Sequence, residues 1–269
     1  MNESLDMMLR SLRLPGFARY AQEIALKAER ESFSYLQFLN HLCEMEMNDR
    51  NTRRVERHIR QSDLPSQKTL ASLEHDKVPE KLRRQLPRLC EGGFVEKAQN
   101  ILVFGLPGRG KTHIVCAIGY ALIDRGYQVL FAPTYKIVQR LLAAKQELRL
   151  EKELKKLDRF DAVILDDIGY VQQNRDEMEV LFTFLAERYE RKSVMITSNL
   201  VFSQWDRIFK DKMTTAAAID RLVHHSIILE VTGPSYRNEK AKESKVGEEN
   251  NNGYCPNEKN ETRKGDVKL

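Results

Sequence analysis

The segment Gly105–Thr112, which reads GLPGRGKT, constrains the fold of this chain more than any other. It matches the pattern G-x-x-x-x-G-K-[ST], follows the apolar run Ile101–Phe104 and precedes the helical residues His113–Ile123. A strand, a glycine-rich loop and a helix in this order form a P-loop, whose backbone N–H groups and helix dipole hold a phosphate. The alternative is a glycine-rich turn with a chance lysine, and the surrounding strand and helix argue against it.

The P-loop motif predicts a site for ATP and Mg²⁺. Lys111 is expected to reach the β- and γ-phosphates, and the hydroxyl of Thr112 is expected to ligate the magnesium ion. The residues expected to contact the nucleotide are Gly105, Leu106, Pro107, Gly108, Arg109, Gly110, Lys111 and Thr112.

Short apolar runs recur after the P-loop and alternate with helical stretches. With Ile101–Phe104 they make five expected strands, and the other four are Gln128–Phe131, Ala162–Leu165, Ser193–Thr197 and Ile227–Val231. Continuous apolar runs separated by helices are typical of a parallel sheet that is covered on both faces. The sequence therefore predicts an α/β core with a five-stranded parallel sheet.

Polar residues stand at the ends of two of these expected strands. Asp166 and Asp167 follow Ala162–Leu165, and Asn199 closes the next strand. We expect Asp166 to hold Mg²⁺ through water and Asp167 to orient or deprotonate the attacking water. Asn199 is placed to reach the γ-phosphate or that water. The alternatives are two solvated acids and an ordinary turn, since Asn is common at strand ends.

The first 75 residues have helical character. Leu5, Met8, Leu9 and Leu12 recur at helical spacing, and Pro15-Gly16 ends that segment. Ser34 followed by Gln37 forms a capping-box pattern, which predicts a long helix running to about Gln61. An all-α region thus precedes the α/β core.

Five arginines recur at three- and four-residue spacing near the end of that long helix. They are Arg50, Arg53, Arg54, Arg57 and Arg60, and we call them the arginine stripe. On a helix they share one face, and we expect only Glu56 to oppose their charge. Five guanidiniums suit a nucleic-acid backbone, with a salt slope of roughly −4 to −5 on duplex DNA and little sequence preference. The alternative, which the composition alone leaves equally open, is a solvated face.

The amino-acid composition further limits the kinds of site and partner that this chain can have. The 269 residues carry a net charge of only +5, so a basic surface has to come from local clustering. The four cysteines form no CxxC pair, which disfavours a zinc site or a disulfide framework. No apolar run approaches the roughly 18–20 residues that cross a bilayer. We expect a cytoplasmic protein with no membrane partner.

Changes in composition divide the chain into four parts. We expect a helical DNA-binding and assembly region at 1–75, a connector at 76–98, the core at 99–237 and a disordered polar tail at 238–269. The tail has almost no apolar residues with which to order itself.

The chain resembles the IstB-like transposition helper ATPases, which are relatives of the DnaC helicase loaders within the AAA+ class. The resemblance covers about residues 1–241. It rests on LRLPGFA at 12–18, FLNHLCE at 38–44, the P-loop at 105–112, ILDDIGY at 164–170, RYER at 188–191, ITSN at 196–199, DRLVHH at 220–225 and GPSYR at 233–237.

This resemblance implies an N-terminal helical DNA-engaging region joined to an AAA+ ATPase core. It implies a homo-oligomer that assembles with ATP on double-stranded DNA and recruits a cognate transposase. Arg221 matches an arginine finger that completes a neighbour's ATP site, and Arg237 matches a residue that senses nucleotide in its own subunit. Many AAA+ proteins carry Asp-Glu where this chain has Asp166-Asp167, and the shorter second acid is expected to slow hydrolysis.

Two other functions stay open at this point. A DnaC-like replicative helicase loader would share the ATP chemistry and differ in its partner. A nucleotide-dependent scaffold that does not hydrolyse ATP would keep Lys111, Thr112 and Asp166, because only Asp167 and Arg221 concern turnover.

Overall fold

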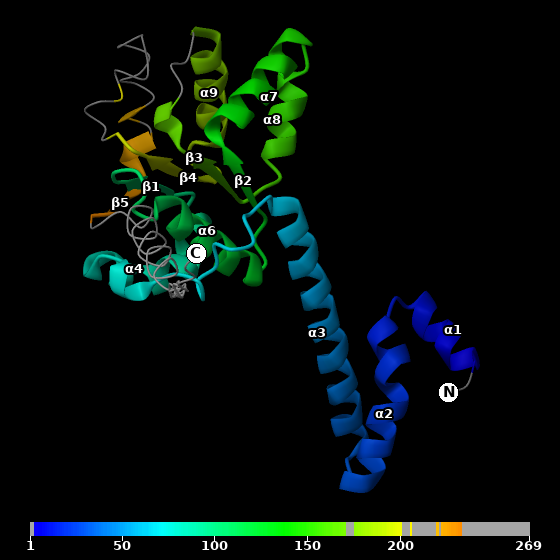
Figure 1. Cartoon of the computed structure of the whole chain (residues 1–269). Coiled ribbons are helices and arrows are strands. Elements are labelled where there is room, and N and C mark those ends of the chain that lie inside the picture. Colours follow the sequence, from blue (N-terminus) through cyan, green and yellow to red (C-terminus); the bar gives the residue numbers. More distant parts are fainter. Residues whose placement is uncertain (1–2, 171–174, 201–204, 206–218, 221, 233–269) are drawn as a thin grey trace, which may run out of the picture.

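The computed structural model describes residues 3–170, 175–200, 205, 219–220 and 222–232 (Figure 1). Its strands are β1 (Asn100–Phe104), β2 (Val129–Pro133), β3 (Ala162–Asp166), β4 (Ser193–Ser198) and β5 (Ser226–Glu230). Its α-helices are α1 (Glu3–Ser11), α2 (Pro15–Glu31), α3 (Tyr35–Ser62), α4 (Glu80–Cys90), α5 (Gly93–Glu96), α6 (Lys111–Asp124), α7 (Thr134–Gln146), α8 (Leu150–Leu157) and α9 (Arg175–Arg188). Short 3₁₀ helices span His75–Lys77 and Ile168–Tyr170.

The five strands form one parallel sheet in the order β2-β3-β4-β1-β5. This confirms the expected α/β core with five parallel strands. The strand boundaries differ by one or two residues, most clearly in β2, which begins at Val129 and continues to Pro133. Strand β2 continues to Pro133 because it pairs with β3 along this length, with Pro133 opposite Asp166.

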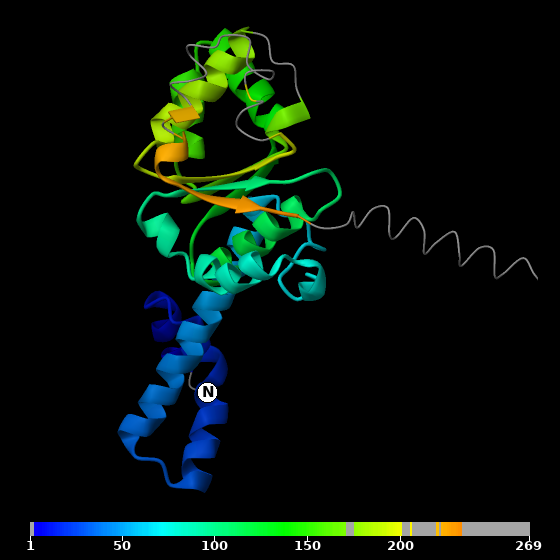
Figure 2. The same ribbon diagram turned by 90° about the vertical axis from the view of Figure 1, so that its left-hand side faces the viewer.

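Helices cover both faces of the sheet (Figure 2). Alternate residues of β1 enter opposite layers: Ile101 packs with α4 and α6, whereas Leu102 packs with α7, α8 and α9. Both side chains are fully buried. Because a parallel sheet buries both faces, its strands are apolar without alternation, which is the pattern that the sequence shows.

The N-terminal helices form an arm that extends from this core (Figure 1). Helices α2 and α3 lie side by side as an antiparallel hairpin, and the expected capping box starts α3. The Ser34 N–H donates to Gln37 Oε1 at 2.7 Å, and the Gln37 N–H donates to Ser34 Oγ at 3.3 Å. Helix α3 ends at Ser62, one residue beyond the expected end.

A buried carboxylate joins the two helices of the hairpin. The Gly16 N–H donates to Glu46 Oε2 at 2.6 Å, and a Cβ at Gly16 would lie only 3.0 Å from the Cα of Glu46. Burial opposes the charge of Glu46, but hydrogen bonds from Arg50 and from the backbone of Gly16 and Phe17 outweigh it and lower its pKa. The glycine of the LPGF segment is thus required for the close approach of α2 to α3.

The arm is attached to the core where α3 ends. The hydroxyl of Tyr120 on α6 donates to the Leu64 carbonyl at 3.3 Å, and the side chain of Leu64 packs over Gly119. The guanidinium of Arg54 lies against Gly126, in the turn between α6 and β2. None of the helices in the described parts is long and apolar enough to cross a membrane.

The buried Arg188 links the end of α8 to the start of β4. Its guanidinium donates to the carbonyls of Leu157 at 3.2 Å and Ser193 at 2.9 Å, and the residue is only 2% exposed. Burial lowers the pKa of Arg188 to about 10, partly offset by Asp158 and Asp161. The RYER segment therefore begins with a structural residue of the core.

A candidate nucleotide-binding site

The strand order brings the expected site residues together. Strand β4 lies between β1 and β3, and parallel strands end at one edge of the sheet. The P-loop follows β1, Asp166 ends β3, and Asn199 comes directly after β4. The three segments, far apart in sequence, therefore meet at the carboxyl edge, where open α/β sheets bind their ligands.

The glycines of the P-loop have the backbone conformation that the loop requires. Gly105 has a φ of 156°, and a Cβ there would lie 2.5 Å from the carbonyl oxygen of Val231. Gly110 precedes α6 with a φ of 84°. Both conformations favour glycine over any residue with a side chain. The loop therefore leads directly into the N-terminus of α6, whose N–H groups and dipole attract a phosphate.

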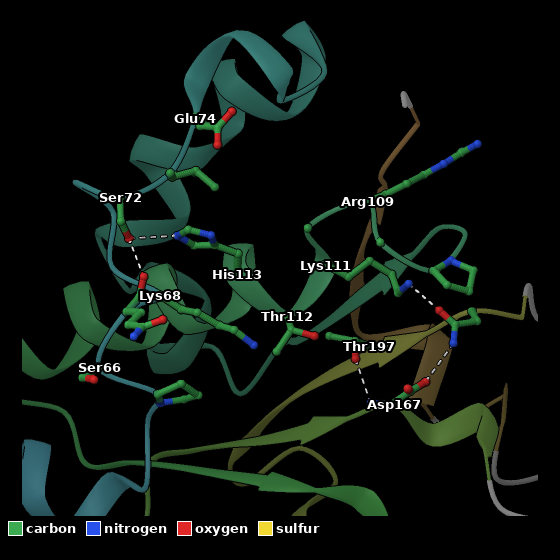
Figure 3. Close-up of a pocket in the computed structure, with 17 residues that line it drawn as sticks. Ser66, Lys68, Ser72, Glu74, Arg109, Lys111, Thr112, His113, Asp167 and Thr197 are labelled. Carbon is green, nitrogen blue, oxygen red and sulfur yellow. Dashed lines mark hydrogen bonds between the residues drawn. The ribbon is translucent and has the colours of Figure 1, made fainter. Parts of the chain in front are cut away.

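Lys111 lies at the centre of the site and is only 7% exposed. Its Nζ donates to the carbonyls of Gly105 at 2.7 Å and Leu106 at 3.1 Å, and also to Asn199 Oδ1. The Nδ2 of Asn199 in turn donates to Asp167 Oδ1 at 3.1 Å (Figure 3). Asn199 therefore connects the P-loop lysine to the second acid.

Asp166 is held by hydroxyl groups from two neighbouring elements. Thr112 Oγ1 and Thr197 Oγ1 both donate to Asp166 Oδ1, at 2.8 and 2.7 Å. Thr197 Oγ1 also accepts from the N–H of Asp167 at 2.8 Å. A hydroxyl and a carboxylate in contact at the phosphate loop are a donor set that suits Mg²⁺, so these residues fit the ion that the motif predicts.

A pocket of about 600 Å³ opens beside these groups (Figure 3). On the core side it is lined by Pro107, Gly108, Arg109, Gly110, Lys111, Thr112, His113, Asp167, Thr197 and Asn199. Gly105 and Leu106 lie outside this lining and contact the site through their carbonyls on Lys111. The volume falls in the range of small-molecule sites.

The opposite wall comes from the segment between α3 and α4, which the sequence did not indicate. It consists of Pro65, Ser66, Gln67, Lys68, Ser72, Leu73 and Glu74. His113 Nε2 lies 3.0 Å from the Thr69 carbonyl and 3.2 Å from Ser72 Oγ, so α6 holds this wall in place. Residues 65–74 carry no motif that could have indicated this wall. His113 could have been recognised as a site residue from its position directly after the P-loop threonine. The sequence analysis also did not identify Thr197 as a site residue.

The arginine stripe lies on α3, away from the pocket, and its charges are more compensated than the sequence suggested. Arg50 pairs with Glu46 at 2.6 Å and Arg53 pairs with Asp49 at 3.1 Å. The expectation that only Glu56 opposes the stripe is therefore wrong. Each acid lies one helical turn before the arginine that it contacts, at a spacing of four residues.

The remaining stripe residues differ in their surroundings. Arg54, Arg57 and Arg60 are all exposed, and Arg54 also donates to Asn51 Oδ1 at 2.6 Å. Arg221 and Arg237 lie outside the described residues.

The sequence matches one family over most of its length. A family model described as IstB-like ATP binding protein matches residues 7–244. A putative insertion sequence ATP-binding protein of Sinorhizobium fredii is 45% identical over 242 residues, covering 90% of this chain and 81% of that protein. The insertion sequence IS21 putative ATP-binding protein of Pseudomonas aeruginosa is 36% identical over 233 residues, covering 87% of this chain and 88% of that protein.

Solved structures share the AAA+ fold of the core. The crystal structure of DnaI has a TM-score of 0.53 and 22% identity, covering 65% of this chain and 95% of that one. AMPPCP-bound DnaA of Aquifex aeolicus has a TM-score of 0.54 and 18% identity, covering 70% of this chain and 57% of that one. At these identities the likeness concerns the fold alone.

Proposed function

The chain belongs to the family of IstB-like ATP-binding proteins, which are AAA+ ATPases, and we propose that it is an ATP-dependent helper of DNA transposition. In this role it assembles on target DNA and recruits or stimulates a transposase. The observation that carries the proposal is the joined network Lys111–Asn199–Asp167 beside Thr112–Asp166, in a chain whose relatives are named insertion sequence ATP-binding proteins.

The pocket residues, together with Asp166 behind Thr112, support distinct roles in this proposal. Lys111 and the P-loop N–H groups bind the phosphates, and Thr112 with Asp166 holds Mg²⁺. The ion, when bound, neutralises charge on the phosphate oxygens. Asp167 accepts the proton of the attacking water, and Asn199 keeps its carboxylate in place through the 3.1 Å hydrogen bond. These roles give ATP hydrolysis to ADP and phosphate.

Hydrolysis depends on a second copy of the chain in this proposal. Arg221 acts as an arginine finger, placing its guanidinium beside a neighbour's γ-phosphate, and Arg237 senses the nucleotide in its own subunit. A guanidinium delivered in trans makes turnover depend on assembly.

DNA binding belongs to the arm in this proposal, with residues 1–75 as the DNA-engaging part and 99–237 as the ATPase. The exposed Arg57 and Arg60 contact backbone phosphates, so binding carries little sequence preference. Double-stranded DNA and the cognate transposase are the partners.

The proposal is tested by ATP-dependent assembly on duplex DNA, followed by electron microscopy and by co-purification with the transposase. Lys111→Ala should abolish assembly, whereas Lys136→Ala, at an exposed lysine of α7, should leave it intact. Assembly that persists at full strength in Lys111→Ala would contradict the ATP site. Capture of a replicative helicase in place of the transposase would favour a helicase loader, and assembly without ATP turnover would favour a scaffold.

A further inference from the structure

A second pocket lies in the arm, where the turn between α1 and α2 meets the middle of α3. Its volume is about 440 Å³, and it is lined by Arg10, Arg13, Pro15, Glu46, Arg50 and Arg53. Four of its six lining residues are therefore arginines, two from the turn region and two from the stripe. None of the six is aromatic, so the pocket offers no surface on which a base could stack.

One of these arginines is fixed in place by the fold. Arg50 Nε donates to the buried Glu46 at 2.6 Å, and Arg50 Nη2 donates to the Arg13 carbonyl at 2.6 Å. Glu46 also holds the Gly16 N–H at the start of α2. The same hydrogen bonds that close the hairpin thus place the guanidinium of Arg50 beside the turn that carries Arg13.

Two other arginines are held by weak, exposed ion pairs. Arg10 contacts Asp6 at 2.8 Å and Arg53 contacts Asp49 at 3.1 Å, with the arginine side chains 73% and 49% exposed. Exposed pairs of this kind contribute little, so their guanidiniums can turn to another anion at small cost. The four arginines contact three acids, one of which, Asp49, also contacts Arg19 at 3.6 Å, so positive charge is in excess around the pocket.

We propose that this pocket binds one phosphate group of the DNA backbone, shared among its four arginines. A phosphodiester carries a negative charge, which the excess of positive charge attracts, and guanidiniums bind phosphate oxygens through paired N–H groups. The inference rests on the proposed DNA binding and adds to it a defined site that includes Arg10 and Arg13. The turn between α1 and α2 thereby becomes part of the DNA-binding surface.

The test is the salt dependence of duplex binding by the full chain, measured by fluorescence anisotropy for single and double variants. Each phosphate contact contributes about 0.9 to the slope of log K against log salt. Arg13→Gln and Arg53→Gln should each lower the slope by no more than about 0.9, and the Arg13→Gln/Arg53→Gln double variant should lose about 0.9 in total, because both residues share one phosphate.

Two further variants serve as comparisons for the Arg13→Gln/Arg53→Gln double variant. Arg53→Gln/Arg60→Gln combines the pocket with a separate stripe residue and should lose about 0.9 more than Arg53→Gln alone, whereas Arg84→Gln, an exposed and paired arginine of α4, should change nothing. A loss of about 1.8 in Arg13→Gln/Arg53→Gln, or no loss at all, would overturn the shared pocket. Wild-type protein that does not bind DNA would instead overturn the proposed function.

The source of the phosphate is distinguished with two duplexes, one with and one without 5′-terminal phosphates. Equal affinities, reduced to the same degree by Arg13→Gln/Arg53→Gln, are expected for an internal phosphodiester. A preference of the wild type for the 5′-phosphorylated duplex that this variant abolishes would overturn the backbone assignment, since the pocket would then take a terminal phosphate.

Discussion

At the scale of single residues, Asn199 has the most consequential position in the nucleotide site. Its amide accepts from Lys111 through Oδ1 and donates to Asp167 through Nδ2. An amide side chain carries its acceptor and its donor on two separate atoms, so it spans the two groups, whereas an ionised carboxylate in its place would have no donor for Asp167. The orientation of Asp167 is therefore coupled to the lysine that binds the phosphates.

Asp167→Asn should preserve ATP binding and lower turnover by about 10²–10⁴, because it removes the group that accepts a proton while keeping the shape of the side chain. The measurement is steady-state ATP hydrolysis with DNA present, together with nucleotide affinity. Asp176→Asn, at an exposed acid of α9, is the matched control and should keep full turnover. Wild-type turnover in Asp167→Asn would remove Asp167 from the proposed chemistry.

At the scale of elements, the hairpin of α2 and α3 depends on a charged group in a buried place. Glu46 is 4% exposed, yet three hydrogen-bond donors keep its carboxylate ionised. The Gly16 N–H is one of the unpaired donors at the start of α2, so the carboxylate serves that helix as a cap supplied from α3. The ionisation of Glu46 and the stability of the hairpin are thus linked.

Glu46 should make the stability of the hairpin depend on pH. Its folded-state pKa lies below the ordinary value of 4.5, so the ionised group stabilises the fold above that pH. This contribution is lost as the pH falls from 4.5 through the folded-state pKa. Denaturant unfolding followed by helical circular dichroism should show the loss in the wild type.

The pH dependence has two informative variants. Glu46→Gln should be less stable near neutral pH and should lack this acid-dependent loss. Glu44→Gln, at an exposed position of the same helix, should retain it. An identical pH profile for wild type and Glu46→Gln would show that the carboxylate does not hold the hairpin.

At the scale of the whole molecule, one continuous stretch of chain runs from the arm to the ATP pocket. Helix α3 carries the arginine stripe, attaches to α6 through Leu64, and continues into residues 65–74, which form a wall of the pocket. His113 fixes that wall to the helix that begins at the P-loop lysine. The proposed DNA-binding and ATP-binding parts therefore share a direct covalent and packed connection.

Mixing two inactive variants tests the proposed assembly. Lys111→Ala lacks its own ATP site but keeps Arg221, whereas Arg221→Ala keeps the site but lacks the finger. Each alone should show little DNA-stimulated turnover, and their mixture should regain a measurable fraction, because one supplies the finger to the other. Wild-type turnover per subunit should also rise with protein concentration.

Two results would contradict the proposed action of Arg221 on a neighbouring subunit. An Arg221→Ala variant with wild-type turnover, or a mixture no more active than its components, would mean that the finger does not act in trans.

The sequence alone determined the P-loop, the five strands and the capped helix α3. These depend on residues close together in the chain, such as the spacing of Gly105–Thr112 or the hydrogen bonds between Ser34 and Gln37. It also indicated the strand-end acids, because parallel strands end at one edge. The family resemblance extended this to the AAA+ fold.

Only the tertiary structure decided which distant residues meet. It placed β4 between β3 and β1, brought residues 65–74 across from the P-loop, and buried Glu46 against Gly16. It also joined Arg13 to the arginines of α3 in one pocket. The physical reason is that such contacts depend on how helices and strands pack, which the local spacing of residue types does not encode.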